Sequence, residues 1–547
     1  MSDISSSDGA GEHSPTTEYE VVAQPDGQKP AKRWWLIGGG IALVVVFSAS
    51  ALAVGLLTGD AVASLEAVPS DVDFVVTLDL LQLSDAERID ALVSAFAEPL
   101  EDAGYIDSAE IDLFGQISED LEDELGVNLF DDLLPWIGRS VAVGGWLPAD
   151  LFTSPDPDIL LVVTVRNRDG AAEFLEQVAD GDFEITTMED GDLYVGTETV
   201  GVFWLGDDLL LAANSRAVIR DALDARSGES LADDEVFSSV LNELPAEPLL
   251  TFFAGPGIVD SIATASSELG PTSPLDGFAD GFRGAAIAIT LVDSGIRFDI
   301  AQLLEGDIAE QAAQPDEVSG VAALPLETLG YAGTVIPDNA IRDLLEEFRA
   351  LDPVAYDEIA VEAQETLGVD LLGEVLPSFG GEMLLSVIQT RDGFLAEESG
   401  ISIGLLVTMG VLDTAPISAT IASLEELAIQ EEVVIDEGTP SVARFEGNEI
   451  VAYQVTDDAL VIGSASSVVS DFLSGDGELT NGELYRELDA ALPGDGLSFY
   501  VDLSRIFDIA EMPRADRAIV EPLRAIGASS SSDGELITGT LLILIDY

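Results

Sequence analysis

The residue types that could carry chemistry in this chain are almost entirely carboxylates. Its 547 residues include 103 Asp and Glu but only 21 Lys and Arg, no cysteine and one histidine. That histidine, His13, and both lysines, Lys29 and Lys32, precede residue 34. Activated nucleophiles and general bases mostly need His, Lys or Cys, and zinc sites mostly need His or Cys. We therefore expect no catalytic and no cofactor-binding residue in the rest of the chain.

Two chemistries need carboxylates alone. A pair of acids can hydrolyse a glycosidic bond, although among 103 acids any spacing arises by chance. Oxygen ligands can also bind Ca²⁺ or Mg²⁺. The densest acidic groups are Asp71 with Asp73, Asp131 with Asp132, Asp156 with Asp158, and Asp476 to Glu483. None matches the EF-hand loop, so we favour a solvated acidic surface, with calcium binding and a carboxylate-only hydrolase as alternatives.

Aromatic residues are divided unevenly along the chain. The tryptophans after residue 57 are Trp136, Trp146 and Trp204, and the aromatic residues singled out farther on are Phe379, Tyr453, Phe499 and Tyr500. These side chains could line an apolar cavity between a sheet and its helices. Core packing is the interpretation that their type favours.

The elements that would position these residues occur twice. Leu125–Pro135 (LGVNLFDDLLP) returns as Leu367–Pro377 (LGVDLLGEVLP), and each is followed by a glycine and a strand-like run, Arg139–Trp146 or Glu382–Val387. Four further blocks match in the same order: Val68–Asp71 with Leu324–Glu327, Asp207–Arg216 with Asp457–Ser466, Leu249–Asp260 with Leu497–Asp508, and Gly284–Val292 with Gly539–Ile545. Repeats in one order indicate a duplication. We predict one copy at 64–303, a linker at 304–319 and a second copy at 320–547.

Each copy has the pattern of an α+β fold, with helices packed on a largely antiparallel sheet. Apolar runs predict strands at Asp73–Leu80, Ile159–Arg166, Leu193–Trp204 and Leu209–Ala213. The loop Gly206-Asp207-Asp208 indicates a hairpin between the last two runs. Helical spacing predicts helices at Glu87–Ala97, Gly170–Ala179, Ala217–Ala225 and Ser467–Leu473. The glycine pairs Gly144-Gly145 and Gly380-Gly381 indicate turns or bulges.

The segment Trp34–Leu57 predicts one N-terminal transmembrane helix. It contains no charged residue, and a helix of this length would be roughly 36 Å long, enough to span a hydrocarbon core about 30 Å thick. Lys29, Lys32 and Arg33 precede it, so the positive-inside rule predicts a cytoplasmic N-terminus and an exported body. Residues 1–33 read as a disordered cytoplasmic tail. The alternative is a cleaved secretory signal, whose apolar core is usually shorter.

Most of the net charge of −82 belongs to the predicted exported body. Such a surface repels nucleic-acid phosphates and anionic lipid, so we expect no nucleic-acid partner. Hydrophobic residues nevertheless make up 47% of the chain, which indicates a folded body and not a disordered polyanion. An acid-coated folded surface predicts salt adaptation, in which dissolved ions screen the self-repulsion.

Three short motifs resemble a known family. Val68-Pro69-Ser70-Asp71, leading into a strand after an N-terminal anchor, resembles a bacterial family of exported single-pass proteins classed as a domain of unknown function. The Leu125–Leu129 block, and the strand at Leu209 with its preceding Asp207-Asp208, are similar to that family as well. The second copy departs from the pattern at Leu324–Glu327. The resemblance implies a membrane-anchored exported protein and no catalytic residue.

These observations predict a non-enzymatic module that Trp34–Leu57 tethers to the cell membrane. It would bind an apolar ligand or an envelope protein, or have a structural role in the envelope. The alternative is a carboxylate-only hydrolase such as a glycosidase. A closed apolar cavity would favour ligand binding, whereas a cleft with two acids beneath aromatic residues would favour the hydrolase.

Overall fold

The computed structural model describes residues 63–80, 86–104, 118–119, 122, 127–148, 157–179, 183–188, 190–196, 201–246, 248–259, 261, 281–306, 309, 318–494, 496–510 and 512–547. The predicted membrane helix Trp34–Leu57, the tail before it and Asp156 lie outside these residues. Among the described residues, no helix is long and apolar enough to cross a membrane. The membrane helix therefore stays a prediction.

The strands fall into an N-terminal half, residues 63–306, and a C-terminal half, residues 318–547. In the N-terminal half they are β1 (Phe74–Asp79), β2 (Ile137–Trp146), β3 (Asp158–Val165), β4 (Phe183–Thr187), β5 (Asp192–Gly196), β6 (Val202–Leu205), β7 (Leu209–Ala213), β8 (Leu250–Ala254), β9 (Phe282–Val292) and β10 (Gly295–Leu304). In the C-terminal half they are β11 (Thr328–Ile336), β12 (Phe379–Gln389), β13 (Ile403–Val411), β14 (Val434–Asp436), β15 (Ser441–Phe445), β16 (Asn448–Val455), β17 (Ala459–Gly463), β18 (Phe499–Asp502), β19 (Leu523–Asp533) and β20 (Leu536–Ile545).

The helices and helical turns are divided in the same way. Those of the N-terminal half are η1 (Leu65–Ala67), α2 (Ala86–Asp102), η3 (Leu129–Leu133), α4 (Arg168–Ala179), α5 (Arg216–Ser227), η4 (Leu231–Asp233) and α6 (Glu235–Asn242). Those of the C-terminal half are η5 (Ser319–Ala323), α10 (Ala340–Leu351), α11 (Pro353–Leu367), η6 (Leu371–Val375), η7 (Leu376–Ser378), α12 (Phe394–Ser399), α13 (Thr414–Gln430), α14 (Ser466–Ser474), η8 (Leu479–Asn481), α15 (Glu483–Ala491), α16 (Leu503–Ile509) and α17 (Arg514–Val520).

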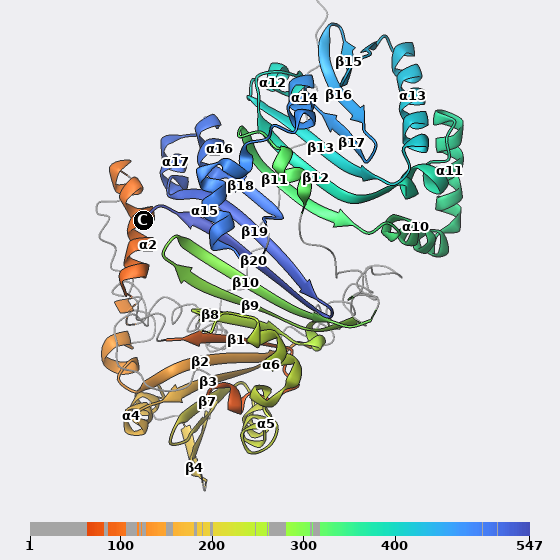
Figure 1. Cartoon of the computed structure of the whole chain (residues 1–547). Coiled ribbons are helices and arrows are strands. Elements are labelled where there is room, and N and C mark those ends of the chain that lie inside the picture. Colours follow the sequence, from red (N-terminus) through yellow and green to blue (C-terminus); the bar gives the residue numbers. More distant parts are fainter. Residues whose placement is uncertain are drawn as a thin grey trace, which may run out of the picture.

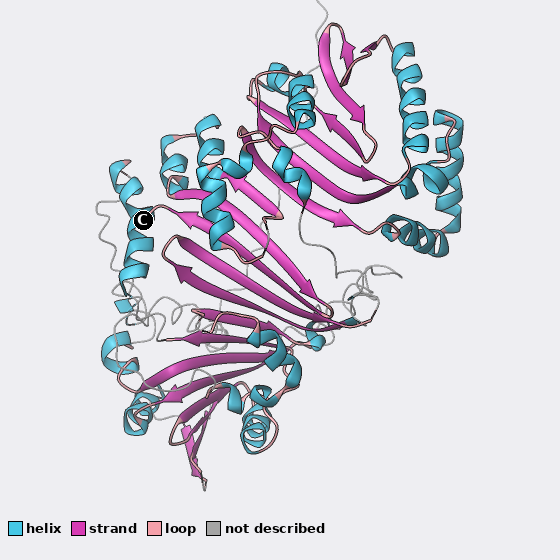
Figure 2. Cartoon of the chain, in the orientation of Figure 1, coloured by secondary structure: helices cyan, strands magenta, loops and turns pink. Residues whose placement is uncertain are grey.

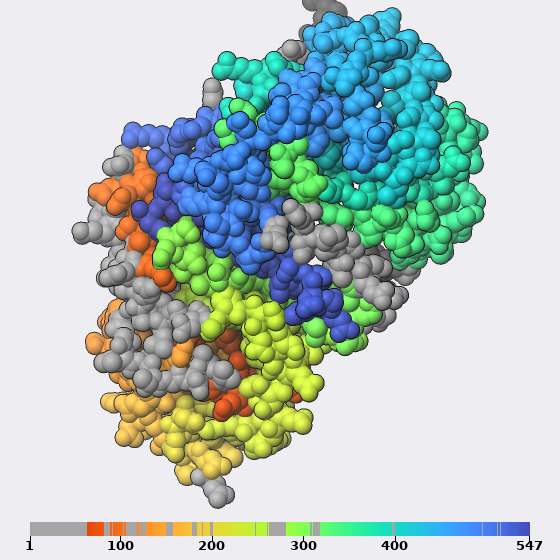
Figure 3. Space-filling model, in the orientation of Figure 1, coloured from red at the N-terminus to blue at the C-terminus, as the bar shows by residue number. Residues whose placement is uncertain are grey.

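The protein is an α+β protein built on one large antiparallel sheet, as the sequence predicts (Figure 1, Figure 2). From one outermost strand to the other, the order is β4-β5-β6-β7-β3-β2-β1-β8-β9-β10-β20-β19-β18-β11-β12-β13-β17-β16-β15-β14. Helices lie on the faces of this sheet, and α10, α11 and α13 gather at one end of the C-terminal half (Figure 1). The space-filling view shows the two halves as a lower and an upper lobe (Figure 3).

The strands of the two halves pair in the same order. In the N-terminal half, β1 lies between β2 and β8, and β3 joins β2 to the β4–β7 meander. In the C-terminal half, β11 lies between β12 and β18, and β13 joins β12 to the β14–β17 meander. Each half ends in a hairpin, β9–β10 or β19–β20, with a two-residue loop.

The two halves join where β10 pairs with β20. The pairing runs from Gly295 opposite Leu544 to Leu303 opposite Leu536, with Asp299 opposite Thr540 at its centre. Gly295 has a φ of 150°, and a Cβ there would lie 1.9 Å from the Ile543 carbonyl oxygen, so only glycine allows this approach. A continuous backbone ladder therefore runs from one half into the other.

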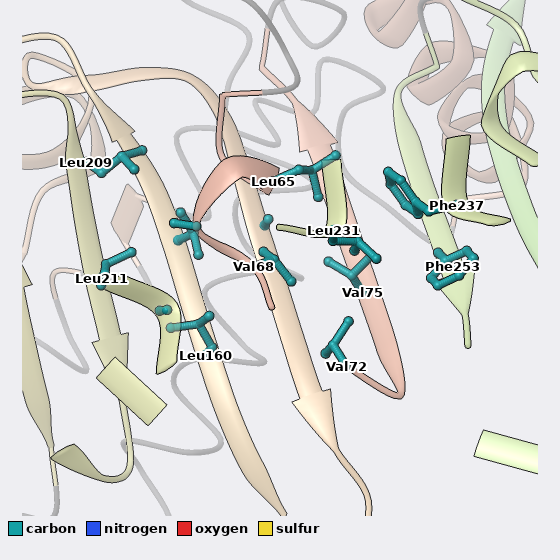
Figure 4. Packing of buried hydrophobic residues seen from close by; sticks show 14 of the residues in the cluster. Leu65, Val68, Val72, Val75, Leu160, Leu209, Leu211, Leu231, Phe237 and Phe253 are labelled. Carbon is teal, nitrogen blue, oxygen red and sulfur yellow. The ribbon is translucent and has the colours of Figure 1, made fainter. Parts of the chain in front are cut away.

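A core of the N-terminal half lies on the sheet face that α5, α6 and η1 cover. Leu160 on β3, Leu211 on β7 and Val75 on β1 gather there with Leu65 and Leu231 (Figure 4). All five side chains are no more than 4% exposed. Burial of a Leu or Val side chain contributes about 1.5–3 kcal/mol, so this cluster holds the helices to the sheet.

The opposite face of the same half carries α4 and an aromatic cluster. The ring centroids of Trp136 and Phe174 are 5.2 Å apart, and Phe183 lies 6.4 Å from Tyr194 and 5.5 Å from Phe203. Edge and tilted ring contacts of this kind stabilise a core beyond the area that they bury. The space between α4 and the β4–β7 meander is thus filled by rings.

Predicted strands and helices agree with the structure where the hydrophobic period is clear, and they differ at one run. The run Leu193–Trp204, predicted as one strand, contains two antiparallel strands, β5 and β6. The chain reverses between Gly196 and Gly201, where Gly196 N donates a hydrogen bond to Gly201 O at 3.2 Å. The hairpin from β6 to β7 is confirmed: Gly206 N donates to Leu209 O at 2.9 Å.

The two glycine pairs have different roles. Gly144-Gly145 marks no turn or bulge, so that prediction is wrong: both glycines lie in regular register with Val75 and Phe74 of β1. A Cβ on Gly145 would lie 2.5 Å from the Phe74 ring, which explains the glycine there. The prediction for Gly380-Gly381 is confirmed, because the register of β12 against β13 shifts at this pair.

Candidate functional site: an apolar cavity beneath helix α13

Helix α13 presents an apolar face to the sheet. Asp413 caps its first turn by accepting a hydrogen bond from Ala415 N at 3.0 Å. Ile417, Ile421 and Ala428 recur at helical spacing, so their side chains lie on one face of the helix. This face is directed toward the meander β14–β17.

The strands opposite α13 supply a second apolar surface. Val451 and Tyr453 alternate along β16, and Leu460 alternates with Ile462 along β17, so these side chains point toward the helix. On the other face of the same strands, residues such as Val461 (1% exposed) are packed against α14. The face toward α13 is less completely filled.

The space between helix and strands is a cavity of about 300 Å³, which we call the α13 cavity. Apolar groups provide nearly all of its wall. The lining residues are Val375, Phe379, Ile417, Thr420, Ile421, Leu424, Glu425, Ala428, Ile435, Ala443, Val451, Tyr453, Leu460 and Ile462. Its inner end rests on the buried side chains of Val375, Ile417 and Leu460.

One charged side chain lines the α13 cavity. The Tyr453 hydroxyl donates a hydrogen bond to Glu425 Oε1. Burial, and then the hydrogen bond to Glu425, raise the pKa of Tyr453 above its usual range. The hydroxyl therefore remains protonated at neutral pH and its proton is committed to Glu425.

The composition of the cavity can be compared with that of small-molecule sites. Its polar lining residues are Thr420, Glu425 and Tyr453. Small-molecule sites are typically concave and mostly apolar, with a few polar groups that orient the ligand. The α13 cavity has this composition, and its volume lies at the small end of the usual range, about 300–1,000 Å³.

The acidic groups singled out as calcium candidates are used by the fold or exposed. Asp73 Oδ2 accepts from Leu147 N at 2.6 Å, and Asp132 Oδ2 accepts from Asn128 N at 2.7 Å. Asp158 is exposed at the start of β3. Among the described residues, no group of three or more His, Cys, Asp or Glu could hold a metal ion. Calcium binding by the remaining acids stays a prediction.

The acids of the segment Asp476–Glu483 lie around η8 and the start of α15. Asp71 is exposed and accepts a hydrogen bond from Trp146 Nε1 at 3.4 Å. Asp131 lies in the first turn of η3 beside Asp132. The structure thus distributes the predicted groups over both halves and brings none of them to the α13 cavity.

The aromatic residues divide between the two interpretations. Phe379 and Tyr453 line the α13 cavity. Tyr500 is 2% exposed in the core of the C-terminal half, and Trp136 and Trp204 are buried in the cores of the N-terminal half. Core packing is therefore the role of Trp136, Trp204 and Tyr500.

A second hollow of about 590 Å³ lies over β10, β20 and β19. Two acids line it, Glu243 and Asp299, but its lining includes no aromatic residue. Asp299 is only 9% exposed and accepts hydrogen bonds from Arg297 Nε at 2.7 Å and from Thr540 Oγ1 at 2.9 Å. This arrangement lacks the aromatic platform that a glycosidase cleft would have.

Sequence reasoning did not find α13 or Glu425. The spacing of Ile417, Ile421 and Ala428 was the available signal for the helix. The role of Glu425 could not be found in this way, because 103 acids give no reason to single out one. Only the fold brings Glu425 next to Tyr453.

The fold and the site together define an α+β protein with one large antiparallel sheet and an apolar cavity under one helix. The chain belongs to the family described as a protein of unknown function (DUF3352), whose model matches residues 34–544. This finding confirms the resemblance to a family classed as a domain of unknown function.

Similarity to other known proteins is slight. The solved structure of crystal form III of TP0453 is 9% identical, with a TM-score of 0.26, and the match covers 48% of this chain and 90% of that chain. Crystal form I of TP0453 is also 9% identical, with a TM-score of 0.23, and covers 44% and 78%. No curated protein matches the chain.

Proposed function

We propose that this protein is a non-enzymatic exported module, tethered to the cell membrane, that binds an apolar ligand in the α13 cavity. The observation that carries the proposal is the cavity of about 300 Å³, with an almost wholly apolar wall, between α13 and the β14–β17 meander. Removing apolar ligand surface from water would drive binding, at about 25 cal/mol per Å² buried.

The tether in this proposal is the uncharged segment Trp34–Leu57, with Lys29, Lys32 and Arg33 on its cytoplasmic side. The absence of cysteine and the acid-rich composition after residue 57 are compatible with an exported, salt-adapted body. Membership of the DUF3352 family does not by itself assign a function.

We further propose that the two halves arose by duplication. The matching strand order supports this, and so do matching local hydrogen bonds. Asn128 Oδ1 accepts from Asp131 N, and Asp370 Oδ1 accepts from Gly373 N, at the same places in the repeated sequence motif. In this correspondence β9 matches β19 and β10 matches β20. The sequence match of Gly284–Val292 with Gly539–Ile545 instead relates β9 to β20, so it is displaced by one strand from the structural correspondence.

Comparison of the halves supports a ligand site in the C-terminal half alone. Trp136 Nε1 donates to the carbonyl four residues earlier at 2.7 Å, and Ser378 Oγ does the same at 2.6 Å, so Ser378 occupies the position of Trp136. Counting from the capping residues Asn167 and Asp413, the position of Phe174 in α4 corresponds to Thr420 in α13. Two rings of the N-terminal aromatic cluster are thus replaced by small side chains.

The substitution Thr420→Phe tests the proposal, because it would place a ring in the α13 cavity where α4 carries Phe174. We expect binding of a neutral naphthylamine dye, measured by fluorescence titration, to weaken at least about tenfold, which corresponds to about 1.4 kcal/mol. The matched control is Ala422→Phe, on the exposed side of α13, which should leave dye affinity unchanged.

Two outcomes would count against the proposal. Equal dye affinity for Thr420→Phe and the wild-type chain would show that the dye binds elsewhere. Failure of the wild-type protein to bind any apolar probe would favour a purely structural role in the envelope. A thermal melt of each variant establishes that the lost binding does not reflect unfolding, since an overpacked core can cost about 1–3 kcal/mol.

A further inference from the structure

The α13 cavity has a negative electrostatic character, although its wall is almost wholly apolar. Three of its lining residues are polar, Thr420, Glu425 and Tyr453, and of these only Glu425 carries a charge. No Arg is among the lining residues, and the chain has no Lys after Lys32. A ligand in the cavity therefore meets one carboxylate and no cation.

The hydrogen-bonding capacity of these groups is acceptor-rich. The Tyr453 hydroxyl has a single proton, which it donates to Glu425 Oε1. The Thr420 hydroxyl donates its proton to the Pro416 carbonyl at 2.8 Å. Glu425 Oε2 accepts no hydrogen bond from any described residue. A carboxylate can accept about four hydrogen bonds, so Glu425 retains capacity for a donor on the ligand.

The charged groups of neighbouring elements do not offset Glu425. On β15, Arg444 faces Asp436 of β14 at 2.9 Å and Glu449 of β16 at 3.3 Å. On α13 itself the next residue, Glu426, is acidic and exposed. An anionic ligand head would thus be desolvated beside a like charge without a counter-ion, which is strongly unfavourable.

We propose that the α13 cavity selects lipophilic ligands with a hydrogen-bond-donating, non-anionic head, a hydroxyl or an ammonium group, and that Glu425 is the residue that receives this head. The inference rests on the proposed function, because it assigns the polar end of the same ligand. Fatty-acid carboxylates are then poorer ligands than alcohols or amines of the same chain length, although the apolar tails are the same. Glu425 acts as the specificity-determining residue.

Displacement of the neutral naphthylamine dye by decanol, decylamine and decanoate tests the inference. The titrations are run in molar salt, where the Debye length is about 3 Å, so that general repulsion from the acidic surface is screened. For the full-length wild-type protein we expect decanol and decylamine to compete at least about tenfold better than decanoate, a difference of about 1.4 kcal/mol.

The variant Glu425→Gln should largely abolish this discrimination, because a glutamine amide can donate to a carboxylate and carries no charge. Decylamine should lose affinity in the same variant, and decanol should change little. Glu426→Gln is the matched control, since it removes the same charge one residue away on the exposed face, and it should retain the wild-type preference.

The outcomes separate the two proposals. Decanoate that competes as well as decanol for the wild-type protein would overturn the head selectivity while leaving apolar binding intact. An unchanged preference in Glu425→Gln would overturn the role of Glu425. If neither the dye nor any of the three amphiphiles binds, the proposed function itself fails.

Discussion

Arg139 and Asp79 form a buried ion pair between neighbouring strands, β2 and β1. Arg139 Nη2 lies 2.6 Å from Asp79 Oδ2, and Arg139 Nε donates to Asp79 Oδ1 at 3.1 Å. The two side chains are 19% and 7% exposed. In a chain with about five times as many acids as bases, this pair uses one of the few arginines to neutralise a largely buried carboxylate.

Replacing this arginine should therefore be costly. We expect Arg139→Ala to lower the free energy of unfolding by about 3–5 kcal/mol, because Asp79 loses its guanidinium partner inside the protein. Arg517→Ala, at an exposed pair with Asp508, should change it by less than about 1 kcal/mol. Chemical denaturation of both variants measures the difference, and equal effects would contradict the assignment of Arg139–Asp79 as a buried pair.

Among the elements, α15 is attached to the sheet by tyrosines. Tyr485 on α15 lies 5.6 Å from Tyr500 on β18, and Tyr331 on β11 lies 6.1 Å from Tyr500, measured between ring centroids. Tyr331 Oη donates to Leu497 O at 2.8 Å. Burial is the main cause that raises the pKa of Tyr331 and of Tyr500 above the usual range.

These shifts predict an alkaline loss of stability. A raised pKa in the folded state means that stability is fully present below the unfolded pKa, about 10 for tyrosine, and falls as pH rises above it. Because both lysines lie in the N-terminal tail and arginine titrates above about 12, tyrosines dominate this window. The unfolding free energy should fall above about pH 10, and Tyr331→Phe with Tyr500→Phe should flatten the slope.

The corresponding measurement is denaturant unfolding at several alkaline pH values, together with the ultraviolet absorbance of tyrosinate. A double variant that loses stability as steeply as the wild-type protein would assign the slope to other groups. Loss of the Tyr331 hydrogen bond lowers stability at all pH values, so the slope with pH and not the absolute stability is the informative quantity.

Elements with a clear period could be predicted from the sequence, and those defined by contacts could not. The helix predicted at Gly170–Ala179 corresponds to α4, and that at Ala217–Ala225 to α5, because their apolar faces repeat every three to four residues. The run Leu193–Trp204 remains apolar through the reversal of the chain, so its period could not locate two strands. The α13 cavity could not be predicted, because it depends on how α13 packs against the β14–β17 meander, and residues far apart in the sequence form its wall.

At the scale of the whole molecule, charge is the dominant feature. A net charge of −82 on a folded chain destabilises the compact state by self-repulsion. Screening shortens the range of this repulsion from about 10 Å at 0.1 M salt to about 3 Å at 1 M. The apolar cores must therefore offset an electrostatic cost that the solvent composition controls.

We accordingly predict that stability of the body rises steeply between low and molar salt. Thermal melts in increasing potassium chloride, with matched concentrations of sucrose as the non-ionic comparison, measure the effect. A flat response to salt would contradict salt adaptation. An equal gain in sucrose would assign the stabilisation to solute exclusion and not to screening.

The pairing of β10 with β20 also covers two strand edges that could otherwise pair with other chains. Taken alone, each half would expose a ten-residue strand with a full row of unpaired backbone groups, which is a template for aggregation. In the joined chain these two strands satisfy one another. Among the residues that the structure describes, the outermost strands that remain are short: β4 has five residues, including the exposed Glu184, and β14 has three and ends in Asp436. One internal pairing thus covers the two long strand edges and leaves only these short edge strands open among the described residues.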